Sequence, residues 1–223
     1  MSYALVTFDV YSALFDIEGS LVPVVGRTLG DRTEAEAFVK AWRRDQMTHV
    51  LIDNALGRGR TSFRHITALA LEHGLAREGI ELPSQDRERL VEAWNHLIPW
   101  PEAADVLGKT RQRVAALALL SNGDQAMLEA LAARLPDVFD HVFSAEAAGV
   151  YKPAAGVYQL PLDRLRLAPD DVLHIAGSAT DALGATAAGL ACAWVNRHSD
   201  SVADPQFRPR FEIHDLNGVV DLV

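Results

Sequence analysis

The sequence predicts an α/β protein in which a doubly wound parallel sheet forms the core and a helical cap domain is inserted after the first strand. Two patterns indicate this fold class. Short apolar runs alternate with segments whose apolar residues recur at helical spacing. The alternation is interrupted once, between residues 8 and 114, by a long stretch with helical patterns. One crossover needs far fewer residues, so this stretch indicates an insertion.

The apolar runs predict five strands, in chain order at residues 3–8, 114–120, 141–143, 172–176 and 191–195. Continuous apolar runs of this length are typical of strands buried on both faces of a parallel sheet. Helices are expected between and after them, at residues 103–112, 125–135, 154–167 and 179–189. These segments carry apolar residues on one helical face, which would pack on the sheet.

The inserted stretch predicts three amphipathic helices, at residues 33–51, 62–73 and 85–96. Thr33 is expected to cap the first of them, with Glu36 completing a capping box. Pro99 and Pro101 close the stretch. We therefore expect a core domain formed by residues 1–15 and 99–223 and a cap domain formed by residues 16–98.

Composition argues against several classes of partner. The 223-residue chain carries a formal net charge of −9, which is unfavourable for binding nucleic acid or an anionic membrane surface. Its single cysteine, Cys192, lies in an apolar run and is expected to be a buried thiol. No stretch has the length and apolarity of a membrane span or the features of a signal peptide. These features predict a cytoplasmic protein.

Polar side chains follow four of the predicted strands. In an open parallel sheet the carboxyl ends of the strands form the ligand-binding edge. Each residue has an ordinary alternative role, as a turn, a helix cap or a solvated surface group. Their shared placement at four strand ends nevertheless favours a catalytic site, made of Asp9, of Ser121 and Asn122, of Lys152 with Tyr158, and of Ser178, Thr180 and Asp181.

With their neighbours these residues form four motifs: Phe8-Asp9-Val10-Tyr11, Leu120-Ser121-Asn122-Gly123, Tyr151-Lys152-Pro153 and Asp181-x-x-Gly184-Ala185. The set resembles the motifs of the haloacid dehalogenase superfamily. Trp42-Arg43 and Trp194-Val195-Asn196-Arg197 add a narrower resemblance to its L-2-haloacid dehalogenase branch. The resemblance extends from Tyr3 to about Val220 and implies a haloacid dehalogenase-like core with a cap.

The resemblance implies a role for each site residue. Asp9 would attack C2 of a small carboxylic acid, expel a leaving group and form an aspartyl ester that water then hydrolyses. Lys152 and Asp181 would hold the nucleophile and activate water with Ser178, while Ser121 and the backbone amides of its loop would grip the substrate carboxylate. Arg43 and Asn122 would receive the departing anion, and Tyr158 would steady the site. The pocket would be shaped by Tyr11, Met47, Phe63 and Thr180. Similar enzymes are commonly dimers, so a homodimer is expected.

Metal use separates the branches of this superfamily. In its phosphatases the first motif is Asp-x-Asp, and a further acidic residue before the final Asp binds Mg²⁺. This chain has Tyr11 and Ala176 at those positions, which removes carboxylate oxygens that Mg²⁺ requires. The eight histidines show no metal-ligand spacing. We therefore expect neither a metal nor another cofactor.

The chain also departs from the dehalogenase branch, which has polar residues where this chain has Ala13 and Ala176, an Asn at Ser178, an aromatic residue at Thr180 and a Gln at Arg44. The departures remodel the positions that surround water and the leaving group. Three alternatives to a 2-haloacid dehalogenase therefore stay open: ring opening of a small cyclic amino acid on the same nucleophile, a Mg²⁺-dependent phosphatase, and a non-catalytic binding protein.

Overall fold

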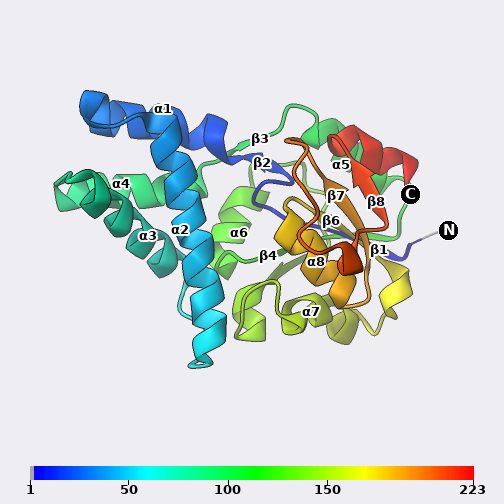
Figure 1. Ribbon diagram of the computed structural model, residues 1–223. Helices are drawn as coiled ribbons and strands as arrows, with labels where there is room; N and C mark the ends of the chain where they lie inside the picture. The colour runs from blue at the N-terminus through cyan, green and yellow to red at the C-terminus, as the bar shows by residue number, and fades with distance from the viewer. Residues whose placement is uncertain (1–2) are drawn as a thin grey trace.

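The computed structural model describes residues 3–223 and contains one six-stranded parallel sheet (Figure 1). The strands lie in the order β5-β4-β1-β6-β7-β8. Their bounds are β1 Leu5–Phe8, β4 Ala116–Ser121, β5 His141–Ser144, β6 Val172–Ala176, β7 Ala191–Val195 and β8 Phe211–Ile213. The predicted parallel sheet is confirmed, whereas the edge strand β8 was not expected. The strand expected from residue 114 begins at Ala116 instead.

The central strand β1 marks the point where the strand order reverses. Leu5 pairs with Ala116 of β4 on one side and with Val172 of β6 on the other. The chain first builds outward through β4 and β5, then returns to the far side of β1 for β6 to β8. Loops leaving the carboxyl ends of β1, β4 and β6 therefore diverge around one crevice.

Four helices flank the sheet: α5 Ala103–Arg111, α6 Gln125–Ala132, α7 Ala155–Leu165 and α8 Ala179–Ala187. Short 3₁₀ turns connect several elements, at Gly30–Arg32, Ala93–Asn95, Ala145–Ala148, Pro169–Asp171, Pro205–Phe207 and Leu216–Asp221. β1 and β6 are fully buried and β7 almost entirely so, as continuous apolar strands require. Cys192 of β7 is buried, as its apolar surroundings predicted.

The inserted stretch forms four helices, which stand beside the sheet at the left of Figure 1: α1 Ile17–Leu29, α2 Ala35–Leu56, α3 Phe63–Glu78 and α4 Ser84–Glu92. Helix α1 was not expected. The predicted capping box at Thr33 is wrong, because the carboxylate of Glu34 accepts hydrogen bonds from the backbone N–H groups of Glu36 and Ala37. Helix α2 continues to Leu56 and ends at Gly57 in the left-handed conformation.

The two connections between sheet and inserted helices run side by side. β2 Phe15–Asp16 pairs antiparallel with β3 Ile98–Pro99. We use the term cap for residues 16–98 below. None of the described helices is long and apolar enough to cross a membrane.

Candidate active site

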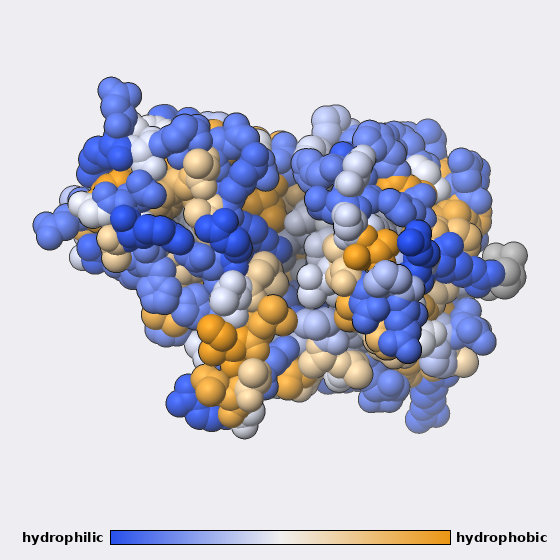
Figure 2. All heavy atoms as spheres, in the orientation of Figure 1, coloured by the Kyte–Doolittle hydropathy of each residue, from blue (hydrophilic) through white to orange (hydrophobic). Residues whose placement is uncertain are grey.

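A cavity of about 620 Å³ lies between the cap and the carboxyl edge of the sheet. Figure 2 shows the surface hollowed between the cap at the left and the core at the right. The sheet side contributes Asp9, Lys152 and Asp181 to the cavity wall, and the cap contributes Arg43 and Met47. The cavity therefore contains charged groups of both signs within a largely buried environment.

Asp9 follows directly on β1, and its backbone N–H donates to the carbonyl of Ile175 on the adjacent strand at 2.9 Å. Its Oδ1 accepts from the Ser121 hydroxyl at 2.9 Å and faces Lys152 Nζ at 3.3 Å. Burial raises the pKa of Asp9 to about 6, although Lys152 and the Ser121 hydrogen bond lower it. Both donors act on Oδ1, so Oδ2 is the oxygen available to an electrophile.

Lys152 lies between two carboxylates. Its Nζ is 2.9 Å from Asp181 Oδ1 and 3.3 Å from Asp9 Oδ1. Its backbone N–H donates to the side-chain oxygen of Asn122 at 2.8 Å. Asn122 therefore fixes the loop that carries the lysine, in addition to lining the cavity.

Asp181 lies in the first turn of α8 and is 6% exposed. Although burial opposes ionisation, Lys152 and His174 hold the pKa of Asp181 well below its usual value. Tyr158 donates to Asp181 Oδ1 at 2.9 Å. The expected association of Asp9, Lys152, Asp181 and Tyr158 is thus present in the geometry.

His174 also belongs to this cluster and was missed from the sequence. It lies within β6, and its Nε2 is 3.1 Å from Asp181 Oδ2 and 3.3 Å from Lys152 Nζ. Its signal in the sequence was a single imidazole inside an otherwise apolar strand. A polar side chain in a strand buried on both faces must find partners inside the protein.

The loop after β6 carries the positions that differ from the dehalogenase branch. Ser178 caps α8 by accepting from the backbone N–H of Asp181 at 3.2 Å, and both Ser178 and Thr180 line the cavity. Ala13 and Ala176 are fully buried beside this loop. A Cβ on Gly177 would lie 2.3 Å from the backbone nitrogen of Ala13, so the close approach of the two loops requires glycine.

The apolar wall of the site comes from both parts of the molecule. The guanidinium of Arg43 lies 5.7 Å from the ring centre of Tyr11, and its Nη1 donates to Gln46 Oε1 at 2.5 Å. Phe63 packs behind Tyr11 with ring centres 5.1 Å apart, while Met47 lines the cavity. The buried Tyr11 hydroxyl has no hydrogen-bond partner among residues 3–223.

Ser121 makes a contact that was not expected from the sequence. The resemblance implied that its hydroxyl grips the substrate carboxylate. In the structure Ser121 is fully buried and its hydroxyl donates to Asp9 Oδ1. Ser121 is thus placed to hold one oxygen of Asp9 in position.

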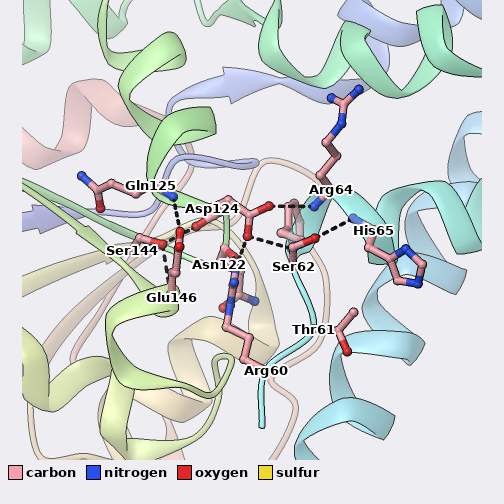
Figure 3. Close-up of polar contacts among 12 residues, drawn as sticks. Arg60, Thr61, Ser62, Arg64, His65, Asn122, Asp124, Gln125, Ser144 and Glu146 are labelled. Atoms are coloured by element: carbon pink, nitrogen blue, oxygen red, sulfur yellow. Dashed lines mark hydrogen bonds and ion pairs between the residues drawn. The ribbon is translucent and has the colours of Figure 1, made fainter.

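A second contact between cap and core was not predicted and is drawn in Figure 3. Asp124 precedes α6, yet its carboxylate accepts from the backbone N–H groups of Phe63 and Arg64 in the first turn of α3, at 2.8 and 2.9 Å. The same carboxylate pairs with Arg60 at 2.7 Å. Glu146 in turn accepts from the backbone N–H of Gln125 at the start of α6, at 2.9 Å.

The cap also binds the loop that carries Lys152. Asn54 makes two hydrogen bonds of 2.8 Å with Tyr151, one to its backbone carbonyl and one from its backbone N–H. The Arg60 guanidinium lies 4.4 Å from the centre of the Tyr151 ring. Both contacts fix the cap against the catalytic loops on one side of the cavity.

The residues present do not suit a magnesium ion of the phosphatase type. Tyr11 and Ala176 offer no carboxylate, and the Lys152 ammonium already lies between Asp9 and Asp181. Mg²⁺ prefers several oxygen ligands in octahedral geometry. Across residues 3–223, no group of three or more His, Cys, Asp or Glu side chains could hold a metal ion.

Fold and site together define a hydrolase of the aspartate-nucleophile type. Its core is a parallel α/β sheet, and its cap covers a buried carboxylate–ammonium cluster. A family model for haloacid dehalogenase-like hydrolases matches residues 3–189. The chain belongs to the haloacid dehalogenase-like hydrolase family.

Two relatives and one solved structure illustrate this similarity. The chain is 32% identical to an (S)-2-haloacid dehalogenase of Pseudomonas sp. (strain YL), covering 97% of this chain and 93% of that protein. It is 34% identical to an (S)-2-haloacid dehalogenase of Xanthobacter autotrophicus, covering 87% and 75% respectively. A structure of the L-2-haloacid dehalogenase from Xanthobacter autotrophicus with chloropropionic acid covalently bound matches with a TM-score of 0.87 and 27% identity, over 99% and 98% of the two chains.

Proposed function

We propose that this protein is a metal-independent hydrolase that displaces halide from C2 of a short 2-haloacid, of S configuration where C2 is chiral, through an ester on Asp9. The observation that carries the proposal is the cluster of Asp9, Ser121, Lys152 and Asp181 at one end of a cap-covered cavity. The similarity to (S)-2-haloacid dehalogenases, and to a structure with covalently bound chloropropionic acid, supports the substrate class.

In the first step Asp9 Oδ2 attacks C2, a C–O bond forms, and halide leaves with the electron pair of the carbon–halogen bond. Ser121 and Lys152 hold Oδ1, which fixes the orientation of the Asp9 carboxylate so that Oδ2 faces C2. Arg43 reaches the cavity from the cap beside Tyr11 and offers a permanent positive charge to the departing halide. The substrate carboxylate would bind backbone N–H groups of the loop after β4.

In the second step water attacks the Asp9 carbonyl carbon, and the bond from that carbon to the substrate oxygen breaks. Asp181 accepts a proton from the water, and one proton is delivered to the departing alkoxide to give a 2-hydroxy acid. The second water proton leaves as Asp9 ionises again. Ser178 and Thr180 line the cavity beside Asp181 and are proposed to hold the attacking water.

Halide release from 2-chloropropionate enantiomers, measured with EDTA present, tests this function. We expect release from the S enantiomer by the unaltered protein and none by Asp9→Asn. Asp16→Asn is a matched control, because Asp16 also lines the cavity and Asn caps a helix as well as Asp does. Repeated turnover in ¹⁸O-water should place label in the Asp9 peptide.

The same assays distinguish the alternatives. Amine products from cyclic amino acids without halide release would favour ring opening on the same nucleophile. Phosphatase activity that requires Mg²⁺ would contradict the proposal. Binding of small acids without turnover of any of these substrates would favour a binding protein.

We further propose a cytoplasmic homodimer. The C-terminal half of α2 exposes Leu51, Ile52 and Leu56, and Figure 2 shows apolar surface there. Such a patch is typical of an interface between copies. The molar mass in solution should be twice that of the chain, and Ile52→Glu should halve it. A monomer at all concentrations would contradict this assembly, and cell fractionation tests the location.

A further inference from the structure

His174 is a buried titratable group that the two chemical steps above do not use. It is fully buried within β6 and does not line the cavity. Its Nδ1 lies 2.8 Å from the hydroxyl of Thr7 on β1. Its Nε2 lies 3.2 and 3.1 Å from the two carboxylate oxygens of Asp181. One imidazole thus connects the centre of the sheet to the carboxylate that activates water.

The contacts define the tautomer of this imidazole. Burial lowers the pKa of His174 and Lys152 lowers it further, whereas Asp181 raises it. The net effect is a pKa below its usual value, so the ring is neutral near pH 7. A neutral ring has one donor and one acceptor nitrogen. The nitrogen facing both Asp181 oxygens must be the donor, because a lone pair there would repel the carboxylate. Nδ1 then accepts a hydrogen bond from the Thr7 hydroxyl.

Three other groups surround His174. The Lys152 ammonium, from the loop after β5, is a donor 3.3 Å from Nε2, farther than either Asp181 oxygen, and its closest partner is Asp181 Oδ1 at 2.9 Å. The ring of Tyr158 on α7 lies edge-on, with ring centres 5.7 Å apart. Cys192 is the partner of His174 in the register of β7, and burial raises the pKa of its thiol, which stays neutral.

A different role for the Thr7–His174–Asp181 chain would be a hydrolytic triad with Thr7 as nucleophile. The geometry excludes it. Thr7 is fully buried in the middle of β1, between β4 and β6, and does not line the cavity. No substrate carbon could reach its hydroxyl without dismantling the sheet. The chain of hydrogen bonds therefore acts on Asp181.

The two oxygens of Asp181 are held unequally. Oδ1 receives Lys152 at 2.9 Å and Tyr158 at 2.9 Å, besides the longer contact with His174. Oδ2 has His174 as its nearest donor, at 3.1 Å. Asp181 also lines the cavity. The crowding at Oδ1 leaves Oδ2 with room for a further hydrogen, which is what a base that takes a proton from water requires.

We propose that His174 is a positioning residue for the hydrolysis of the aspartyl ester: its Nε2–H holds the Asp181 carboxylate with Oδ2 towards the attacking water. The inference rests on the proposed function and deepens its second step. The first step depends on Asp9 and its contacts with Ser121 and Lys152, so the two steps should respond differently to loss of the imidazole.

His174→Phe removes the donor and keeps a ring of similar volume, His174→Gln keeps an N–H donor, and Thr7→Val removes the hydroxyl that sets the tautomer. Thr110→Val is the matched control, since Thr110 is an equally buried threonine of α5. Halide release is measured in a rapid-mixing experiment, together with the mass of the intact protein. Thermal unfolding of each variant shows that it is folded.

We expect His174→Phe to release about one halide per site rapidly and then to turn over about 10- to 100-fold more slowly. The ester should accumulate on Asp9 and be visible as added mass. His174→Gln should recover much of the steady-state rate, Thr7→Val should show an intermediate loss, and Thr110→Val should match the unaltered protein. A folded His174→Phe variant with unchanged turnover, or with the initial halide release slowed as much as turnover, would overturn the inference.

The hydrogen bond itself is measured without a substrate. In protein labelled with ¹⁵N-histidine, the His174 ring should show a protonated Nε2 and an unprotonated Nδ1 at pH 8, and Thr7→Val should perturb the Nδ1 signal. The opposite tautomer would overturn the inference whether or not the protein acts on haloacids. An unaltered protein that releases no halide but shows the expected tautomer would contradict the dehalogenase function while leaving the hydrogen bond to Asp181 established.

Discussion

Replacing Asp9 by Asn is expected to stabilise the fold, and to do so more at pH 8 than at pH 5. Burial raises the pKa of Asp9 from 3.8 to about 6, so the folded protein binds this proton more tightly than the unfolded chain does. The stability associated with a raised pKa is fully present below 3.8 and is lost as the pH rises through about 6. Asn is neutral at every pH and avoids this loss.

The expected size follows from the two pKa values. They differ by about 2, which corresponds to about 3 kcal/mol once Asp9 is fully ionised. Part of this loss is already present at pH 5, so the advantage of Asp9→Asn should grow by about 1 to 2 kcal/mol between pH 5 and pH 8. For a chain of this length that is a difference of about 3–6 °C in melting temperature.

Thermal unfolding of both proteins across this pH range measures the effect. Asp181→Asn is the control of opposite sign: the pKa of Asp181 is lowered, so its ionised form adds stability at neutral pH that is lost as the pH falls. Asp181→Asn should therefore be destabilised by a nearly constant amount from pH 5 to pH 8, and this penalty should shrink only as the pH falls below about 4. A constant offset between the unaltered protein and Asp9→Asn from pH 5 to pH 8 would refute the raised pKa of Asp9.

Three further outcomes are expected. Ser121→Ala removes a donor to the nucleophile, so kcat/KM should fall about 10- to 100-fold and its acid limb, expected near pH 6, should move to higher pH in a pH–rate profile. Asp124→Ala leaves Arg60 buried without its partner and should cost about 3–5 kcal/mol in urea unfolding, and Asp124→Asn, which can still cap a helix, should cost less. Gly177→Ala places a Cβ 2.3 Å from a backbone nitrogen and should lower the melting temperature, whereas Gly108→Ala, with open space around it in α5, should raise it slightly.

The inner strands of the sheet were predictable because they are almost entirely buried and so consist of continuous apolar runs. This pattern marks β1, β4, β6 and β7 in the sequence, and a shorter apolar run marks the partly buried edge strand β5. It does not mark β8, which has three residues at the edge of the sheet and only partial burial. β8 lacks an apolar run, so its pairing with β7 depends on neighbours that are distant in the sequence.

Helix α1 was missed for a different reason. It contains two glycines and Pro23, which lower the intrinsic tendency to form a helix. The carboxylate of Asp16 caps its first turn, and Leu21 and Val25 pack in the core. Tertiary packing thus overrides local propensity, which a pattern read along the chain does not contain.

The site was predictable as far as its residues follow strand ends. Asp9, Lys152 and Asp181 were expected together, and they lie within contact distance. His174 was hidden by the apolar strand around it. Asp124 has the position of an ordinary cap of its own helix, and its partners on α3 lie about 60 residues earlier in the chain. Only the fold brings such groups together.

The exchange of helix caps at Asp124 affects how this enzyme can be recombined with its relatives. A core carboxylate completes the first turn of α3, and Glu146 supplies the hydrogen bond that Asp124 does not make to α6. A chimera with a foreign cap would remove the Arg60 guanidinium that donates to the Asp124 carboxylate, and one with a foreign core would remove the carboxylate that accepts from the first turn of α3. Cap and core are therefore expected to be inherited together with Arg60, Asp124 and Glu146 as one compatible set.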